Sequence, residues 1–131
     1  MRSICTLFFL SLLISCGSPS KKAMHVTGTI DGLRKGTLYL QKVEDSALVS
    51  VDSFKIEKDK PYSLGDDIDS AEIYYLYLDK EDGDSLNDRI QFFGEKGEIT
   101  INTLLKTFDS SAQISGSENQ VLLEEYQSML K

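Results

Sequence analysis

Residues 24–43 read MHVTGTIDGLRKGTLYLQKV and carry the clearest structural pattern in the chain. Apolar and polar side chains alternate with a period of two over the first eight residues and again from Thr37 to Val43. That period places successive side chains on opposite faces of a strand, whereas a helix requires a period of 3.6. The Asp31-Gly32 pair between the two segments favours a turn, so the stretch predicts a β-hairpin.

Strand patterns continue through most of the chain. The short aromatic run Ile73–Leu78 is typical of a strand covered on both faces. The segment Ala47–Glu57 changes phase near Asp52-Ser53, which indicates a β-bulge. Glu95-Lys96-Gly97 favours a tight hairpin between its two flanking strands. The other predicted strands are Pro61–Leu64, Asp88–Gly94, Glu98–Asn102 and Ser110–Ile114.

A helical period replaces the strand period after residue 115. Five apolar residues fall on one helical stripe: Leu122, Leu123, Tyr126, Met129 and Leu130. Ser115 and Glu118 have the spacing of a capping box, so we expect an amphipathic helix over residues 116–131. Packing of the stripe on the protein's own sheet is the favoured interpretation, and docking of the stripe in a partner's groove is the alternative.

The fold class follows from these elements. We predict a mainly β domain over residues 24–115, either an antiparallel β-sandwich or a partly open barrel of seven or eight strands, with one C-terminal α-helix. A length of 131 residues fits one domain. The net charge of −7 and the lack of a basic block argue against nucleic-acid binding, because phosphate contacts need clustered Lys and Arg.

The N-terminus predicts a lipoprotein signal peptide over residues 1–15. Arg2 precedes an apolar segment, Ile4–Ile14, which spans roughly 16 Å as a helix and is too short to cross a bilayer. Leu13–Cys16 resembles the bacterial lipobox, which implies cleavage before Cys16 and lipidation of its thiol and new amine. We therefore expect anchoring to a membrane through Cys16 and a flexible tether over residues 16–23. We expect the protein to be located in the cell envelope, at the outer membrane and facing the periplasm.

Several longer strings resemble one family. Residues 26–43, 73–79, 88–101 and 114–119 are similar to the domain of unknown function DUF4369. This resemblance implies a lipid-anchored or secreted protein of Bacteroidota, in a family whose domain often precedes a thioredoxin-like redox domain. The chain contains no Cys-x-x-Cys motif, so no redox residue is carried over.

Several side chains could form a binding or catalytic site, but each also has a simpler structural interpretation. Asp79–Asp88 is rich in oxygen ligands but breaks the EF-hand pattern, so a solvated loop is favoured. Tyr74, Tyr75 and Tyr77 suggest a stacking platform for a sugar or peptide, although core or sheet surface is the favoured interpretation. His25 is the one histidine and lies close to the expected tether, where a catalytic triad could not be held rigidly. We expect no catalytic residues, cofactor or metal.

Two functions remain at this stage. The first is a non-catalytic envelope lipoprotein domain that binds or presents a protein partner or ligand, with the helical stripe as its contact surface. The alternative, which the family resemblance implies, is a specificity subunit or truncated N-terminal module of a thioredoxin-like thiol-disulfide oxidoreductase system.

Overall fold

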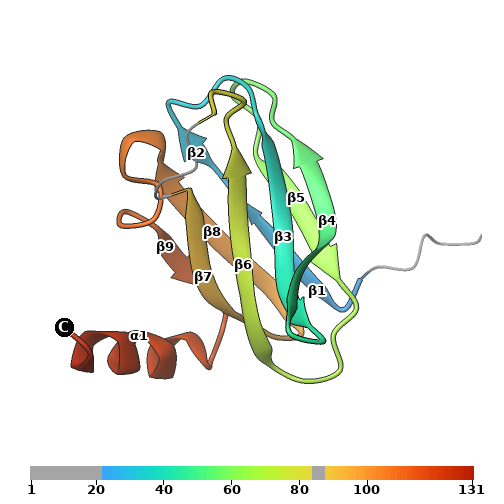
Figure 1. Cartoon of the computed structure of the whole chain (residues 1–131), viewed down its shortest axis with the longest axis vertical. Helices are drawn as coiled ribbons and strands as arrows, with labels where there is room; N and C mark the ends of the chain where they lie inside the picture. The colour runs from blue at the N-terminus through green and yellow to red at the C-terminus, as the bar shows by residue number, and fades with distance from the viewer. Residues whose placement is uncertain (1–21, 84–87) are drawn as a thin grey trace, which may run out of the picture.

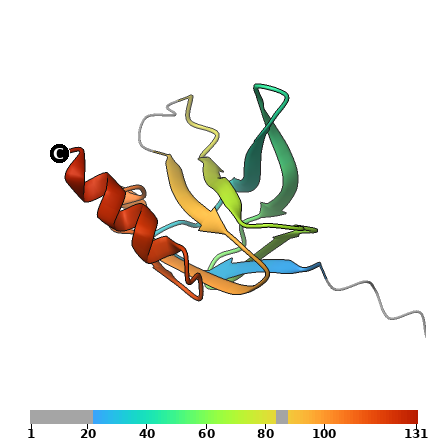
Figure 2. The same ribbon diagram turned by 90° about the horizontal axis from the view of Figure 1, so that it is seen from below.

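A computed structural model describes residues 22–83 and 88–131 (Figure 1). Within these residues, nine strands form two sheets that face each other across one core. One α-helix, α1 (Gln120–Met129), follows the last strand and lies to one side of the sheets (Figure 2). The mainly β fold with a C-terminal helix is thus confirmed. The predicted signal peptide and Cys16 lie outside the described residues.

The first sheet combines parallel and antiparallel ladders. Its central strands are β1 (Met24–Gly28) and β8 (Gly97–Leu104), which run parallel to each other. The edge strand β5 (Tyr62–Asp66) is antiparallel to β1, and β9 (Gln113–Ser115) is antiparallel to β8. The two-residue strand β2 (Ile30–Asp31) continues the course of β1 along β8. A parallel ladder was not expected from the hairpin-like sequence pattern.

The second sheet is entirely antiparallel. Its strand order is β4 (Ala47–Lys55), β3 (Thr37–Glu44), β6 (Glu72–Asp79) and β7 (Arg89–Gly94). The predicted bulge is present between β3 and β4, where Leu40 is opposite Asp52 but Gln41 is opposite Ser50. The extra residue is therefore Val51, one position before the predicted site.

Two predicted hairpins are wrong. β1 and β3 lie in different sheets, and β7 and β8 likewise. The connection after β2 crosses between the sheets because Leu33, only 9% exposed, inserts into the core. At the second turn, the Gly97 N–H donates to the Ala23 carbonyl at 2.9 Å, so the chain joins the first sheet immediately. At each of these turns the chain passes from one sheet to the other instead of forming a hairpin within one sheet.

The core consists of the alternating side chains that the strands turn inward. Tyr74, Leu76 and Leu78 of β6 face the core, and their neighbours Tyr75 and Tyr77 face outward. The run Ile73–Leu78 is therefore buried on one face and half-exposed on the other, not covered on both. The remaining fully buried large side chains are Met24, Leu38, Leu40, Tyr62, Leu64, Phe92, Ile99, Ile101 and Phe108.

A close approach in the first sheet requires a glycine. The buried Tyr62 hydroxyl donates a hydrogen bond to the Ile101 carbonyl at 2.5 Å. A Cβ atom on Gly28 would lie 1.8 Å from the same carbonyl oxygen and 2.8 Å from the tyrosine oxygen. Only a residue without a side chain leaves room for this contact.

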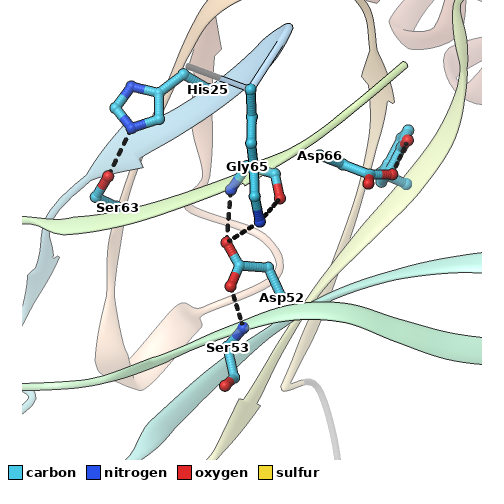
Figure 3. Close-up of polar contacts among 8 residues, drawn as sticks. His25, Asp52, Ser53, Ser63, Gly65 and Asp66 are labelled. Atoms are coloured by element: carbon cyan, nitrogen blue, oxygen red, sulfur yellow. Dashed lines mark hydrogen bonds and ion pairs between the residues drawn. The ribbon is translucent and has the colours of Figure 1, made fainter. Parts of the chain in front are cut away.

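Asp52 joins the edges of the two sheets. Its carboxylate accepts backbone N–H groups from Ser53 in its own strand and from Gly65 in β5, both at 2.8 Å (Figure 3). Lys22 lies 3.5 Å from the same carboxylate and donates to the Gly65 carbonyl at 3.1 Å. Charge-assisted bonds of this kind are stronger than neutral ones, so they hold β4 against β5.

The helix begins later than predicted. It starts at Gln120, its N-cap Asn119 makes no side-chain cap, and Ser115 ends strand β9. The predicted capping box is therefore wrong. A side chain from elsewhere takes its place: the Glu95 carboxylate accepts both the Glu118 N–H and the Asn119 side-chain amide. An acidic group before the first turn also suits the helix dipole.

Candidate interaction surface

The helix is attached to the sheets by polar groups. Gln120 is 4% exposed, and its side-chain oxygen accepts the Phe93 N–H at 2.9 Å. Gln127 donates to the Gln91 side chain at 3.2 Å, two residues before Phe93 on β7. These contacts cover part of the free edge of β7, which is how proteins commonly protect an edge strand. The side of α1 that faces the protein is thus mainly polar.

The apolar stripe points away from the protein. Leu122 is 64% exposed, Tyr126 is 56%, Met129 is 75% and Leu130 is 68%, whereas Leu123 is half-buried. Packing of the stripe on the protein's own sheet was the favoured sequence interpretation, and it is wrong for these four residues. The helix has turned its Gln side inward because Phe93 supplies a backbone donor that only a polar side chain can satisfy.

An exposed apolar helix face is unusual for a single domain. Isolated apolar side chains on a surface need no explanation, but a stripe of four on one helix face is a contiguous patch. Such patches mark contact surfaces more often than chance exposure. The sequence identified the stripe residues correctly, but their direction depends on Gln120, which sequence reasoning did not single out.

A groove runs between α1 and the open seam of the two sheets. It has a volume of about 220 Å³, and Arg89, Ile114, Gln120, Glu124 and Gln127 are among its lining residues. Its walls are mostly polar, and charges of both signs lie within it. It is small beside typical ligand pockets of about 300–1,000 Å³. The groove therefore adds a polar margin to the helix face rather than a separate ligand site.

The outer face of the second sheet carries a row of aromatic side chains. The Tyr39 and Tyr77 rings stack with centroids 6.0 Å apart, and the Arg89 guanidinium lies 4.8 Å from the Tyr77 centroid. Tyr77 is thus contacted by both the Tyr39 ring and the Arg89 guanidinium. This arrangement does not favour a stacking platform for sugars, which requires free ring faces.

A charged cluster lies where β3 and β6 meet β5. Lys42 contacts the carboxylates of Asp66 at 3.3 Å, Glu44 at 3.4 Å and Glu72 at 3.6 Å. The Tyr74 hydroxyl donates to Asp66 at 2.7 Å. Burial alone would lower the pKa of Lys42, but the three carboxylates outweigh it and raise that pKa. Burial, together with the carboxylates of Asp66 and Glu72, raises the pKa of Tyr74. The cluster stabilises both groups in their protonated forms.

His25 has a serine partner that sequence reasoning missed. Its Nε2 lies 2.7 Å from the Ser63 Oγ on the neighbouring strand (Figure 3), and its Nδ1 lies 3.9 Å from Glu98. The order Ser, His, Glu resembles a catalytic triad. However, Nδ1 has no hydrogen-bond partner, so nothing fixes the tautomer that a general base requires. Only the strand register could have revealed the Ser63 contact.

A further hollow lies at the other end of the first sheet. It has a volume of about 440 Å³ between the segments 29–34 and 56–62. Its charged lining is balanced, with Arg34, Lys58 and Lys60 facing Asp31, Glu57 and Asp59. Lys60 pairs with Glu57 at 2.6 Å, which leaves no concentrated charge of either sign. The lining therefore points to no particular ligand class.

The described residues carry neither a metal-binding cluster nor a membrane-spanning helix. Across residues 22–83 and 88–131, no group of three or more His, Cys, Asp or Glu is arranged to hold a metal ion. The acidic loop 79–88 is only partly covered by these residues. No helix in the described part of the chain is long and apolar enough to cross a membrane.

Fold and surface together define a small β domain of two facing sheets that carries an exposed apolar helix face. A family model for a domain of unknown function, DUF4369, matches residues 24–123. The chain belongs to this family, as its sequence strings predicted. The family's description names no activity, so the match assigns none. No curated protein and no solved structure matches the chain.

Proposed function

We propose that this protein is a non-catalytic lipoprotein domain of the cell envelope that binds a protein partner through the apolar stripe of α1. In this proposal Cys16 carries the lipid anchor, and the β domain presents the helix to the partner. The contact residues are Leu122, Tyr126, Met129 and Leu130, with Leu123 at the margin.

One observation supports the binding role above the others. α1 directs Gln120 and Gln127 toward β7 and leaves four large apolar side chains in solvent. Burying a Leu or Met side chain stabilises a protein by about 1.5–3 kcal/mol. The domain alone does not gain this free energy, because the helix leaves these side chains in solvent. A partner that covers the stripe would recover it.

The partner surface is tested with a pair of charge substitutions. Leu122→Asp and Tyr126→Asp should each abolish recovery of the partner from detergent-solubilised envelope, because a carboxylate in a buried apolar contact is costly. Val121→Asp is the matched control, since Val121 is 57% exposed but lies on another side of the helix. All three variants should unfold at the same temperature as the parent chain. Equal recovery by Leu122→Asp and Val121→Asp would reject the proposal.

The anchor is tested by mass. The protein from the membrane fraction should have the mass of residues 16–131 plus its acyl chains, and Cys16→Ala should lose both the cleavage and the acyl mass. More than one acyl chain is needed for stable anchoring, at about 0.8 kcal/mol per buried CH₂. An unmodified, soluble product from the unsubstituted gene would refute this part of the proposal.

A further inference from the structure

We propose that the free edge of β7 binds an extended polypeptide segment as an added antiparallel strand, through the backbone of Arg89 and Gln91. This edge is separate from the α1 stripe, so the inference goes beyond the proposed function and does not depend on it. The added strand is recognised mainly by its own N–H and C=O groups, with side-chain positions setting its preference.

The ladder to β6 shows which backbone groups of β7 point outward. In an antiparallel pair, alternate residues exchange hydrogen bonds, and the backbone groups of the residues between them point away from the partner strand. The carbonyl of Asp88, the residue before β7, accepts the Leu78 N–H at 2.8 Å, so the even-numbered residues of β7 bond to β6. The N–H and C=O groups of Arg89, Gln91 and Phe93 therefore point away from β6. The Phe93 N–H has this direction, because its acceptor is a side chain of α1.

Much of this edge is open to an added strand. α1 takes the Phe93 N–H, but no other segment in the described part of the chain is hydrogen-bonded to the outward backbone groups of Arg89 and Gln91. Both residues are exposed. The other sheet edges offer less, since β4 is joined to β5 through Asp52, and β2 and β9 are only two and three residues long. An unpaired edge is a ready template for another chain.

The groove beside α1 lies along the inner side of this edge. It has a volume of about 220 Å³, and it is lined by Ile90 and Ile114 as well as by the polar Gln120 and Glu124. A strand added to β7 would direct the residue opposite Ile90 into this groove, because side chains alternate across a strand. Threonine fits these mixed walls, since it carries both a methyl and a hydroxyl group. The groove thus receives one side chain of the strand and not a compact ligand.

Charge sets the residue at the next position. Arg89 exposes its side chain on the outer face of the second sheet, where its guanidinium lies 4.8 Å from the Tyr77 ring centroid. The residue of the added strand opposite Arg89 lies on the same face, and an opposite charge at such a position is stabilising. In an antiparallel strand this residue follows the one opposite Ile90. The preferred segment therefore has threonine or a similar residue followed by an acidic one.

A peptide with matched N-methylated controls tests the backbone contact. The probe is acetyl-Lys-Val-Thr-Glu-Lys-amide, titrated into the full chain held in detergent and followed by amide NMR signals. Two residues of the probe would each exchange a pair of hydrogen bonds with β7, which corresponds to a dissociation constant of about 1 mM. Binding should shift the Arg89 and Gln91 amide signals and slow their hydrogen exchange.

The controls separate backbone pairing from attraction by charge, because all the peptides carry the same charge. N-methylation of the probe at valine and glutamate removes the N–H groups that donate to β7, so binding should weaken at least about tenfold. N-methylation at threonine alters an N–H that points away from β7, so binding should stay within about twofold.

A substitution in β7 gives the reciprocal test. Gln91→Pro removes an N–H that makes no bond to β6, and proline is tolerated where the N–H of an edge strand faces outward. It should lower the affinity of the probe at least about tenfold, whereas Gln91→Ala keeps the N–H and should change it about twofold or less. Thermal unfolding checks that both variants fold. If Gln91→Pro does not fold, the N-methylated peptides decide the inference.

The pattern of shifted signals supports or overturns the inference. Shifts at Arg89 and Gln91 that only the valine/glutamate N-methylation removes support it. No shift at these two residues with about 10 mM probe overturns it, and so does equal binding by the two N-methylated peptides. Shifts confined to Leu122 and Tyr126 overturn it as well and leave the proposed function standing. Conversely, Leu122→Asp should not change binding of the probe, because the stripe is a separate surface.

Discussion

Gln120 should control both the position of α1 and the protection of the β7 edge. The substitution Gln120→Met keeps the length of the side chain but removes the oxygen that accepts the Phe93 N–H. We predict that this N–H is then left without a hydrogen-bond partner. A buried donor left unsatisfied costs about 1–3 kcal/mol, and the remaining helix attachments are a few polar contacts. We take about 2 kcal/mol as the expected loss, which corresponds to roughly a 30-fold fall in local stability.

Hydrogen exchange at single-residue resolution measures this effect directly. Protection of the Phe93 amide should fall about 30-fold in Gln120→Met, while amides in the middle of β6 keep their protection because the core is unchanged. Gln127→Ala is the control: its bond to Gln91 is exposed, so we expect a change of about twofold or less. Unchanged protection at Phe93 would refute the role assigned to Gln120. A fall that extends to the β6 amides would show that the helix is part of the cooperative core.

Three further predictions concern the β domain. Gly28→Ala should lower the free energy of unfolding by about 3 kcal/mol or more, read from the denaturant midpoint, because its Cβ would overlap the Ile101 carbonyl; an unshifted midpoint would contradict this. Tyr62→Phe should cost about 1–2 kcal/mol by losing its buried hydrogen bond, whereas Tyr39→Phe at the half-buried surface should cost less than about 0.5 kcal/mol; equal costs would argue against the Tyr62 bond. Burial raises the pKa of both Tyr62 and Tyr74 above the ordinary value of 10.0. The free energy of unfolding that the two protonated hydroxyls contribute is therefore complete below pH 10 and is lost as the pH rises further. Unfolding measured from pH 8 to 11 should show this loss, and a double change to Phe should flatten it.

The β domain illustrates a limit of pattern reasoning about pairing. Alternation in residues 24–31 and 37–43 correctly predicted two strands, since inward-facing Leu38 and Leu40 carry their own signal. It wrongly paired these strands, because a turn sequence describes the local chain direction and not which sheet the chain joins next. Leu33 enters the core and carries the chain across. Only the burial of that side chain distinguishes a sheet crossing from a hairpin.

The helix illustrates a second limit. Its apolar stripe was identified from spacing alone, and spacing normally indicates which face is buried. Here the buried face is instead chosen by one backbone donor at Phe93 and one carboxylate at Glu95. Both come from β7 and the turn after it, about 25 residues earlier in the chain. No local pattern records such contacts, so the expectation that the stripe packs inward was wrong.

The sequence by itself determined the period of each segment and therefore the type of most elements, the mainly β class with one C-terminal helix, the family and the stripe residues. These properties depend on neighbours within a few positions, where side-chain alternation and residue chemistry act directly. The tertiary structure decided which strands pair, where Tyr62 and Gly28 fit together, how His25 finds Ser63, and which side of α1 faces solvent. These properties depend on contacts between residues far apart in the chain, and their energies appear only when the whole core is assembled.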